Sequence, residues 1–245
     1  PLTYSELLTG RRINSSMSFG MYVDIILDKE TKISFGDGTN LKYGTISNKM
    51  PNNYQLLLAL DNNTYLTFTV GMFGVIAAYT GIYNEIYYKK NLDNLSPLSD
   101  DFNEQYFEKL CVGVKPKSSV KVLLATEQRI PGLGNGVLQD ILFNAKINPK
   151  REISSLTDID KSTLLQSIKM TLKNMILEGG RDTETDLFGN HGNYKTILSL
   201  VLVDNVPIRL GWPKHSDLDE FQCGNPIIKE TSSGGVIYYC PYCQK

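Results

Sequence analysis

The sequence contains no run of 18 apolar residues, so it predicts no transmembrane helix. Its first residues, PLTYSELLTGRRINSS, also lack the basic and then apolar layout of a secretory signal. A cytosolic location is therefore the default expectation. A large net charge is absent as well, because 25 basic and 26 acidic side chains leave a formal charge of −1. The overall charge therefore does not by itself indicate a nucleic-acid or membrane partner.

The charge is unevenly distributed along the chain. Between residues 109 and 151 only Glu127 and Asp140 oppose eight basic side chains, which is a local excess of six positive charges. The eight are Lys109, Lys115, Lys117, Lys121, Arg129, Lys146, Lys150 and Arg151. Such a segment can attract a polyanion. A solvated charged face is the alternative.

Cysteine is scarce, and three of the four cysteines lie in the last 23 residues. In a cytosolic chain this clustering indicates a metal before a disulfide. Cys240 and Cys243 have the C-x2-C spacing that forms half of a structural zinc site. Cys223 belongs to the other half, in which Glu220 stands where a second cysteine is expected.

A fourth zinc ligand can come from several side chains near Cys223. The candidates are His215, Asp219 and Glu220. His215 is the preferred one, because imidazole joins thiolates readily at zinc. A hairpin without metal is the alternative.

Residues 1–95 read as β-structure with short β-branched and aromatic runs. Turn signals lie at Asp28-Lys29, at Gly36-Asp37-Gly38 and at Asp61-Asn62-Asn63. Several strands at close spacing indicate an antiparallel sandwich or barrel. Pro97 marks the end of this region.

A helical region follows, over residues 96–199. Ser99 is predicted to cap a first helix, and Thr157 to cap a long one that ends at Gly179-Gly180. The apolar face of the long helix is predicted to hold Leu164, Leu165, Ile168, Leu172, Met175 and Ile176. Residues 200–245 form a third, smaller segment. The predicted class is α+β.

The segment RIPGLGNGVLQDILF places three glycines and Asn135 before an apolar helical pattern. A dinucleotide-binding fingerprint would need a third glycine at Val137 and a preceding strand, and KVLLATEQ reads as a helix. Two helices joined by a tight glycine turn fit better. The second helix would begin at Gly134-Asn135, and its free N–H groups can bind phosphate. The alternative is a turn whose glycines only permit positive φ.

Three segments together resemble the formamidopyrimidine-DNA glycosylase / endonuclease VIII family. SVKVLLATEQRIPGLGNGVLQDILFNAKINPKR resembles its helix–two-turn–helix, EGGRDTETDLFGNHGNYKTIL its next segment, and GGVIYYCPYCQK its zinc hairpin. The resemblance implies an antiparallel β-sandwich, a helical DNA-binding domain and a C-terminal zinc-finger-like hairpin. It also implies a base-excision-repair DNA glycosylase with AP-lyase activity on oxidised bases in duplex DNA. Damaged duplex DNA would be the partner of a monomer located at the nucleoid.

The resemblance also implies roles for particular residues on the DNA. Asn135, with Gly134 before it, and Lys121 would bind phosphates that flank the damaged nucleotide. The stretch from Arg181 to Tyr194 would line the lesion pocket. Because an enzyme that acts on a base in a duplex must extrude it, phosphate contacts on both sides have a mechanical purpose.

The resemblance does not supply a catalytic residue. Family enzymes attack the sugar C1′ with an N-terminal proline, assisted by the next glutamate. Pro1 is a poor candidate, because Leu2 stands in place of the glutamate and no long helix follows. YSELLTGRRINSSMSFGMYVDI instead resembles a family segment well inside the first domain. We therefore expect the proline–glutamate pair upstream of residue 1.

Other family positions also differ. Met21 stands near the family's catalytic lysine, and Gly235 stands at its hairpin arginine. Asp37 and Gly71-Met72 align near the methionine and arginine that fill the vacated base stack, whereas Phe73 matches the inserted phenylalanine. A position in the sheet core is the alternative for Phe73. These differences leave two further possibilities open, a non-catalytic relative that binds damaged or bent DNA and a nucleotide-dependent enzyme.

Overall fold

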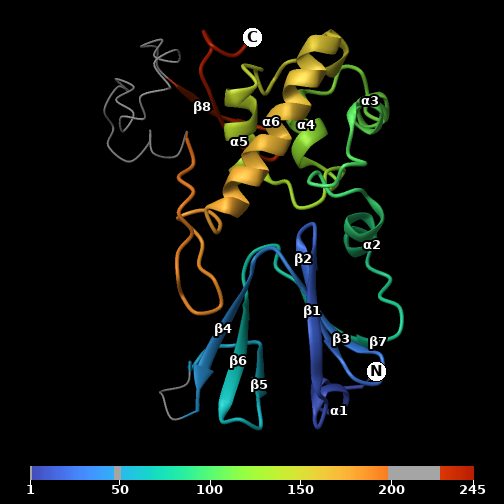
Figure 1. Ribbon diagram of the computed structural model, residues 1–245, viewed down its shortest axis with the longest axis vertical. Coiled ribbons are helices and arrows are strands. Elements are labelled where there is room, and N and C mark those ends of the chain that lie inside the picture. Colours follow the sequence, from blue (N-terminus) through green and yellow to red (C-terminus); the bar gives the residue numbers. More distant parts are fainter. Residues whose placement is uncertain (1, 47–50, 198–226) are drawn as a thin grey trace. The chain divides into compact units, whose positions relative to one another are not determined.

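The computed structural model describes residues 2–46, 51–197 and 227–245 (Figure 1). The chain divides into two compact units. The β unit holds Pro1–Asn94 with Thr183–His191, and the helical unit holds Leu95–Asp182 with Gly192–Lys245. In this division a loop from the predicted helical segment belongs to the β unit, and the C-terminal hairpin belongs to the helical unit. The predicted boundary between residues 199 and 200 lies outside the described residues.

The β unit contains two antiparallel sheets, with strand orders β1-β2-β3-β7 and β4-β6-β5. The strands are β1 Ile13–Phe19, β2 Tyr22–Leu27, β3 Thr31–Gly36, β4 Thr39–Thr45, β5 Leu56–Ala59, β6 Thr64–Val70 and β7 Ile76–Thr80. Ile33 and Phe35 from the first sheet share one buried cluster with Leu66 and Phe68 from the second. The predicted antiparallel sandwich is therefore confirmed.

The predicted turns of the β unit are confirmed, and each has a local cause. Lys29 and Glu30 both have positive φ between β2 and β3, a geometry that matches the strand twist. Asn63 has φ 62° before β6, and the side chain of Asn62 accepts the N–H of Thr64. Two short helices, α1 Tyr4–Leu8 and α2 Ile86–Asp93, also belong to this unit.

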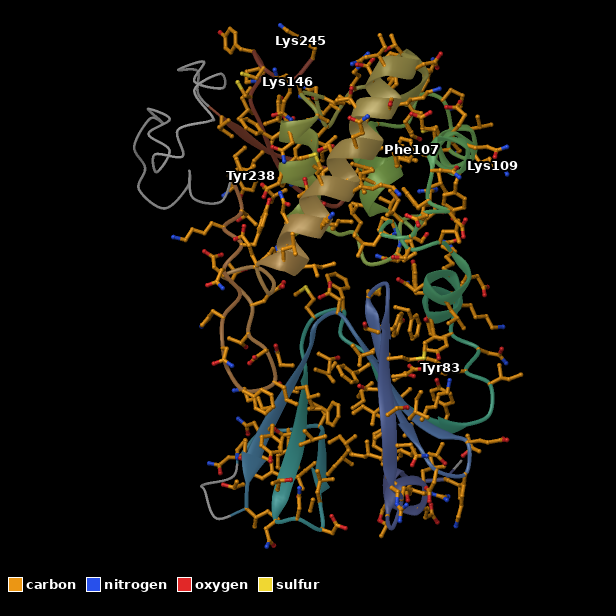
Figure 2. The ribbon with its side chains drawn as sticks, in the orientation of Figure 1. Tyr83, Phe107, Lys109, Lys146, Tyr238 and Lys245 are labelled. Atoms are coloured by element: carbon orange, nitrogen blue, oxygen red, sulfur yellow. The ribbon has the colours of Figure 1, made fainter. Side chains whose placement is uncertain are left out.

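The helical unit contains α3 Glu104–Val112, α4 Val120–Ala125, α5 Asn135–Asn144 and α6 Asp158–Leu177. Within its described residues, Phe102, Leu124, Leu138, Ile141 and Ile168 are among the side chains with no exposed area, and all belong to one buried cluster. Figure 2 shows Phe107 of α3 in this interior and Lys109 on the outer side of the same helix.

The predicted cap of the first helix in this unit is wrong. Ser99 lies in a turn, where its N–H donates to Ser96. The helix begins after Asn103, whose side chain accepts the N–H of Tyr106 at 3.1 Å. Asparagine directly before Glu104 satisfies an open N–H of the first turn, which Ser99 is too far back to do.

The long helix α6 has the predicted ends. Thr157 and Asp160 form a capping box at its start, and Gly179 and Gly180 adopt positive φ after its end. The predicted apolar face is buried or partly buried except for Ile176, which is 60% exposed. Met175 takes the inward position in the last turn, so Ile176 faces outward. Among the described helices, none combines the length and apolar character needed to cross a bilayer.

The C-terminal hairpin consists of β8 Ile228–Ser232 and β9 Gly235–Tyr239, as predicted. Strand β9 packs on α5, and the chain end is fixed to the segment after α5. The side-chain amide of Gln244 donates to the carbonyl of Ile147 at 2.9 Å. Tyr238 of β9 and Lys146 both lie in this region of the helical unit (Figure 2).

Candidate nucleic-acid interface

The glycine turn joins two helices and does not follow a strand. Helix α4 ends at Ala125, and α5 begins at Asn135 with Gly134 as its N-cap. Gly132 has φ 76°, a conformation that side chains disfavour. This geometry removes the basis for the nucleotide-cofactor alternative, which needs a strand before the glycines.

The first turn of α5 leaves room for an anion. Gly134 provides no side-chain cap, and the first turn contains no acidic residue. A Cβ on Gly134 would meet no atom within 4 Å. No side-chain cap therefore binds the first N–H groups of α5, and no carboxylate in this turn offsets the positive end of the helix dipole. Such a terminus has the chemistry of a phosphate site.

Two other segments of the helical unit meet this helix start. The guanidinium of Arg181 occupies the space beside Gly136, where a Cβ would collide with it. The side-chain amide of Asn135 lies against Gly235 of the hairpin, where a Cβ would collide with it. We refer to Asn135, Gly136, Arg181 and Gly235 as the α5 cluster. It brings a cation and an amide donor to the positive end of a helix.

Lys121, the other predicted phosphate ligand, is 1% exposed. Its ammonium donates to main-chain carbonyls of the hairpin turn, at Ser232, Ser233 and Gly235. Burial lowers the pKa of this lysine. Its contact with DNA stays a prediction, and the structure shows the ammonium facing the protein.

The loop that follows α6 ends at Tyr194, whose side chain is held in the interior of the helical unit. Tyr194 is 8% exposed, and its hydroxyl donates to Oδ2 of the buried Asp140 at 3.1 Å. Burial and the Asp140 carboxylate raise the pKa of Tyr194. Main-chain bonds from Tyr194 to Gly180 and from Asp182 to Tyr194 close the base of the loop and so hold Arg181. The contact of Tyr194 with DNA stays a prediction, and the structure shows its side chain facing the protein interior.

The tip of this loop packs in the β unit. Leu187 joins the buried cluster of that unit, and the Phe188 ring meets Tyr43 of β4 edge-on at 5.8 Å. Asp186 accepts the N–H groups of Phe188 and Asn190 at 2.8 Å each, so the tip is a preformed turn. The stretch from 181 to 194 thus divides between the two units, and its place in a lesion pocket stays a prediction.

Phe73 lies on a turn of the β unit and is 90% exposed. Its backbone has φ 65°, which is strained for a bulky side chain. Gly38 and Gly74 are in backbone contact beneath the turn, with no space for a Cβ on either. The neighbouring Met72 is 82% exposed. The alternative position in the sheet core is therefore wrong, and the turn presents two apolar side chains to solvent.

The basic segment from 109 to 151 does not form one cationic surface. Lys121 is buried, and three other members are in ion pairs. These pairs are Arg129–Glu127 at 2.9 Å, Lys150–Glu230 at 2.7 Å and Arg151–Asp160 at 2.6 Å. Two of the acids lie outside the segment, so a count along the chain overestimates the local positive charge.

Of the predicted zinc ligands, Cys240 and Cys243 lie within the described residues. Cys240 is buried beside Phe143, and Cys243 packs against the same small cluster. Pro1, His215 and Cys223 lie outside the described residues. Among the residues that can be described, no three histidine, cysteine or acidic side chains are close enough to hold a metal ion.

Gln139 is a further residue of this region, and its role was not predicted from the sequence. Its side chain is 6% exposed and forms two hydrogen bonds with the backbone of β9. The available signal was a pair of polar residues, Gln139 and Asp140, within an otherwise apolar helix. The partners of these residues come from segments far along the chain, so that signal did not reveal what they bind.

Comparison with known proteins agrees with this arrangement. Residues 94–186 match the formamidopyrimidine-DNA glycosylase H2TH domain. The formamidopyrimidine-DNA glycosylase of Prochlorococcus marinus (strain NATL2A) is 32% identical over 152 residues, which are 61% of this chain and 49% of that protein. That of Salmonella newport is 31% identical over 151 residues, which cover 61% of this chain and 51% of the relative. The matched region spans about half the length of these relatives.

Solved structures extend the likeness in fold to nearly the whole chain. The MutM (Fpg) protein from Thermus thermophilus has a TM-score of 0.75 at 22% identity, covering 98% of this chain and 86% of that one. Lactococcus lactis Fpg in complex with abasic-site DNA has a TM-score of 0.75 at 21% identity, covering 98% and 84%. These likenesses define the class as an α+β fold with a helix–two-turn–helix. Residues 94–186 therefore hold an H2TH domain of the formamidopyrimidine-DNA glycosylase type, and the chain is similar to that family in sequence and in fold.

Proposed function

We propose that this protein is a base-excision-repair DNA glycosylase with AP-lyase activity that acts on oxidised bases in duplex DNA. The observation that carries the proposal is the α5 cluster, where Asn135 and Arg181 meet an uncapped helix N-terminus. Phosphate is the anion that suits this combination of N–H groups, amide and guanidinium. The named relatives are formamidopyrimidine-DNA glycosylases, and Lactococcus lactis Fpg is solved with abasic-site DNA.

In this proposal, Asn135, Gly134 and Arg181 bind the backbone beside the lesion, and Phe73 enters the base stack. An apolar wedge between base steps favours a kinked duplex from which a nucleotide can be extruded. The chemistry then requires an amine that attacks C1′ and forms a Schiff base as the damaged base leaves. We assign this amine to no described residue.

A second candidate is a non-catalytic relative that binds damaged or bent DNA. It is favoured by two positions at which the resemblance expects charged side chains. Met21 stands where a lysine is expected, and Gly235 stands where an arginine is expected. A protein with the α5 cluster but without a reactive amine would bind DNA and leave it intact.

We also propose that the hairpin holds structural zinc through Cys223, Cys240 and Cys243, with His215 as the fourth ligand. The donor set supports this, since three thiolates and an imidazole suit tetrahedral zinc. The described Cys240 and Cys243 lie directly after β9. A bound zinc would add stability to the hairpin.

Binding and trapping experiments test the two functions. The protein is titrated with duplex DNA containing an abasic site at several salt concentrations, and then treated with borohydride. We expect log K to fall linearly with log[salt], by about 0.9 for each phosphate neutralised, and a covalent adduct to form. Binding without an adduct would favour the non-catalytic relative. Binding that is absent or insensitive to salt would overturn both proposals.

Replacing Phe73 by glycine tests the role of this side chain in base extrusion with little change in the stability of the protein. Glycine adopts φ 65° without strain but costs more chain entropy, so we expect the free energy of unfolding to change by less than about 1 kcal/mol. The extent of base extrusion by the protein should fall several-fold, and 2-aminopurine fluorescence in a lesion-containing duplex measures it. Ile82→Gly is the control, because Ile82 is similarly exposed at 83% elsewhere in the β unit. Equal fluorescence for wild type and Phe73→Gly would contradict the wedge role.

A further inference from the structure

The hairpin turn 232–235 is held by a buried cation. Lys121 of α4 is 1% exposed, and its ammonium donates to the carbonyls of Ser232, Ser233 and Gly235, the last at 3.2 Å. An ammonium has three N–H donors, and three carbonyls accept them here. Lys121 therefore has no remaining donor for a phosphate oxygen unless it releases the turn.

Gln139 of α5 holds the same hairpin through its second strand. Its Nε2 donates to the carbonyl of Val236 at 3.0 Å, and its Oε1 accepts the N–H of Tyr238 at 3.1 Å. The side-chain amide thus pairs with β9 as a neighbouring strand would. Losing this amide would leave the Val236 carbonyl and the Tyr238 N–H without their side-chain partner.

The position of the turn matters because the turn touches Asn135. The Asn135 amide lies so close to Gly235 that a Cβ there would collide with it. Lys121 and Asn135 therefore meet the same residue of the turn, one at its carbonyl and one at its Cα. A turn that moves away would free the Asn135 side chain to adopt other rotamers.

We infer that Lys121 and Gln139 are positioning residues, which hold the hairpin turn against Asn135 and so orient the amide of Asn135 toward phosphate. Lys121 acts through the turn and does not itself touch DNA. The DNA part of this inference rests on the proposed function. The structural part, that these two side chains hold the hairpin, stands on the contacts alone.

Hydrogen exchange of the free protein tests the structural part. Lys121→Met and Gln139→Leu keep most of the side-chain volume and remove the donors. Each variant should raise the exchange rate of the Tyr238 amide, whose N–H donates to Gln139, by about tenfold or more. Lys117→Met is the matched control, because Lys117 is an exposed lysine close by in sequence, and its exchange should equal that of wild type. Unchanged hairpin exchange in both test variants would overturn the inference.

DNA affinity tests the functional part through Asn135. In the wild-type background each variant should weaken binding about tenfold with the same salt slope, because no phosphate contact is removed. In an Asn135→Ala background the same substitutions should cost less than about twofold, since they act through that side chain. Additive losses, or a salt slope that falls by about one in Lys121→Met, would mean that Lys121 contacts phosphate directly and would overturn the inference.

Failure of the proposed function looks different. If wild-type protein does not bind duplex DNA, the proposed function fails, whereas the exchange experiment still decides whether Lys121 and Gln139 hold the hairpin. If wild type binds and the variants behave like Lys117→Met, the proposed function stands and this inference fails.

Discussion

Asn135→Asp is expected to weaken the affinity for duplex DNA by about 100-fold or more while leaving the protein as stable as before. The carboxylate would stand in the first turn of α5, beside the groups proposed to bind phosphate, and two like charges in close contact cost several kcal/mol. The same carboxylate interacts favourably with the helix dipole, by roughly 0.3–1 kcal/mol. The two measurements are a fluorescence-anisotropy titration and a thermal unfolding curve.

The same substitution at the other end of the helix is the control. Asn144 is the last residue of α5, and its amide donates to Thr171 at 3.2 Å. Asn144→Asp should lower stability slightly, because a carboxylate is unfavourable at a helix C-terminus, and should leave DNA affinity within about twofold of wild type. If Asn135→Asp binds DNA as wild type does, the α5 cluster is not the DNA-binding site.

Asp140→Ala is expected to have the largest effect on stability. Asp140 has no exposed area and accepts hydrogen bonds from the Tyr194 hydroxyl and from the Ile197 N–H, each at 3.1 Å. Alanine leaves the buried Tyr194 hydroxyl and the partly buried Ile197 N–H without this acceptor, at a cost of about 3 kcal/mol. For a protein of this size the Tm should fall by roughly 10 °C, measured by calorimetry.

Two variants show whether the effect comes from this network. Tyr194→Phe removes one of the two donors, so its loss and that of Asp140→Ala should not add in the double variant. Asp158→Ala, an acid with a fully exposed side chain at the start of α6, should leave the Tm nearly unchanged. A Tm for Asp140→Ala within about 2 °C of wild type would show that the network contributes little.

Local chemistry accounts for the features that the sequence analysis predicted correctly. The capping box of Thr157 and the glycine pair after α6 act on backbone groups within a few residues, so their effect is visible in a short window. The same is true of the turns at Asp28-Lys29 and at Asn63. The error at Ser99 has the same origin, because Asn103, an equally good cap, lay only four residues further on and directly before the helix.

Long-range contacts account for what it missed. Lys121 counted as part of a cationic segment, yet its partners are 111 to 114 residues away along the chain. Gln139 binds β9 almost as far away, and Lys150 is paired with Glu230 of β8. No periodicity or spacing encodes such pairings, so charge counted along the chain differs from charge presented by the fold.

The sequence by itself determined the antiparallel sandwich, the start of α5 at Asn135, the course of α6 and the C-terminal hairpin, because alternation, caps and glycines act locally. Only the tertiary structure decided which polar groups face outward. It exposed Phe73 on a turn closed by Gly38 and Gly74, and it buried Lys121 among carbonyls. Burial depends on which distant segments come to lie together, and that is a property of the packed chain.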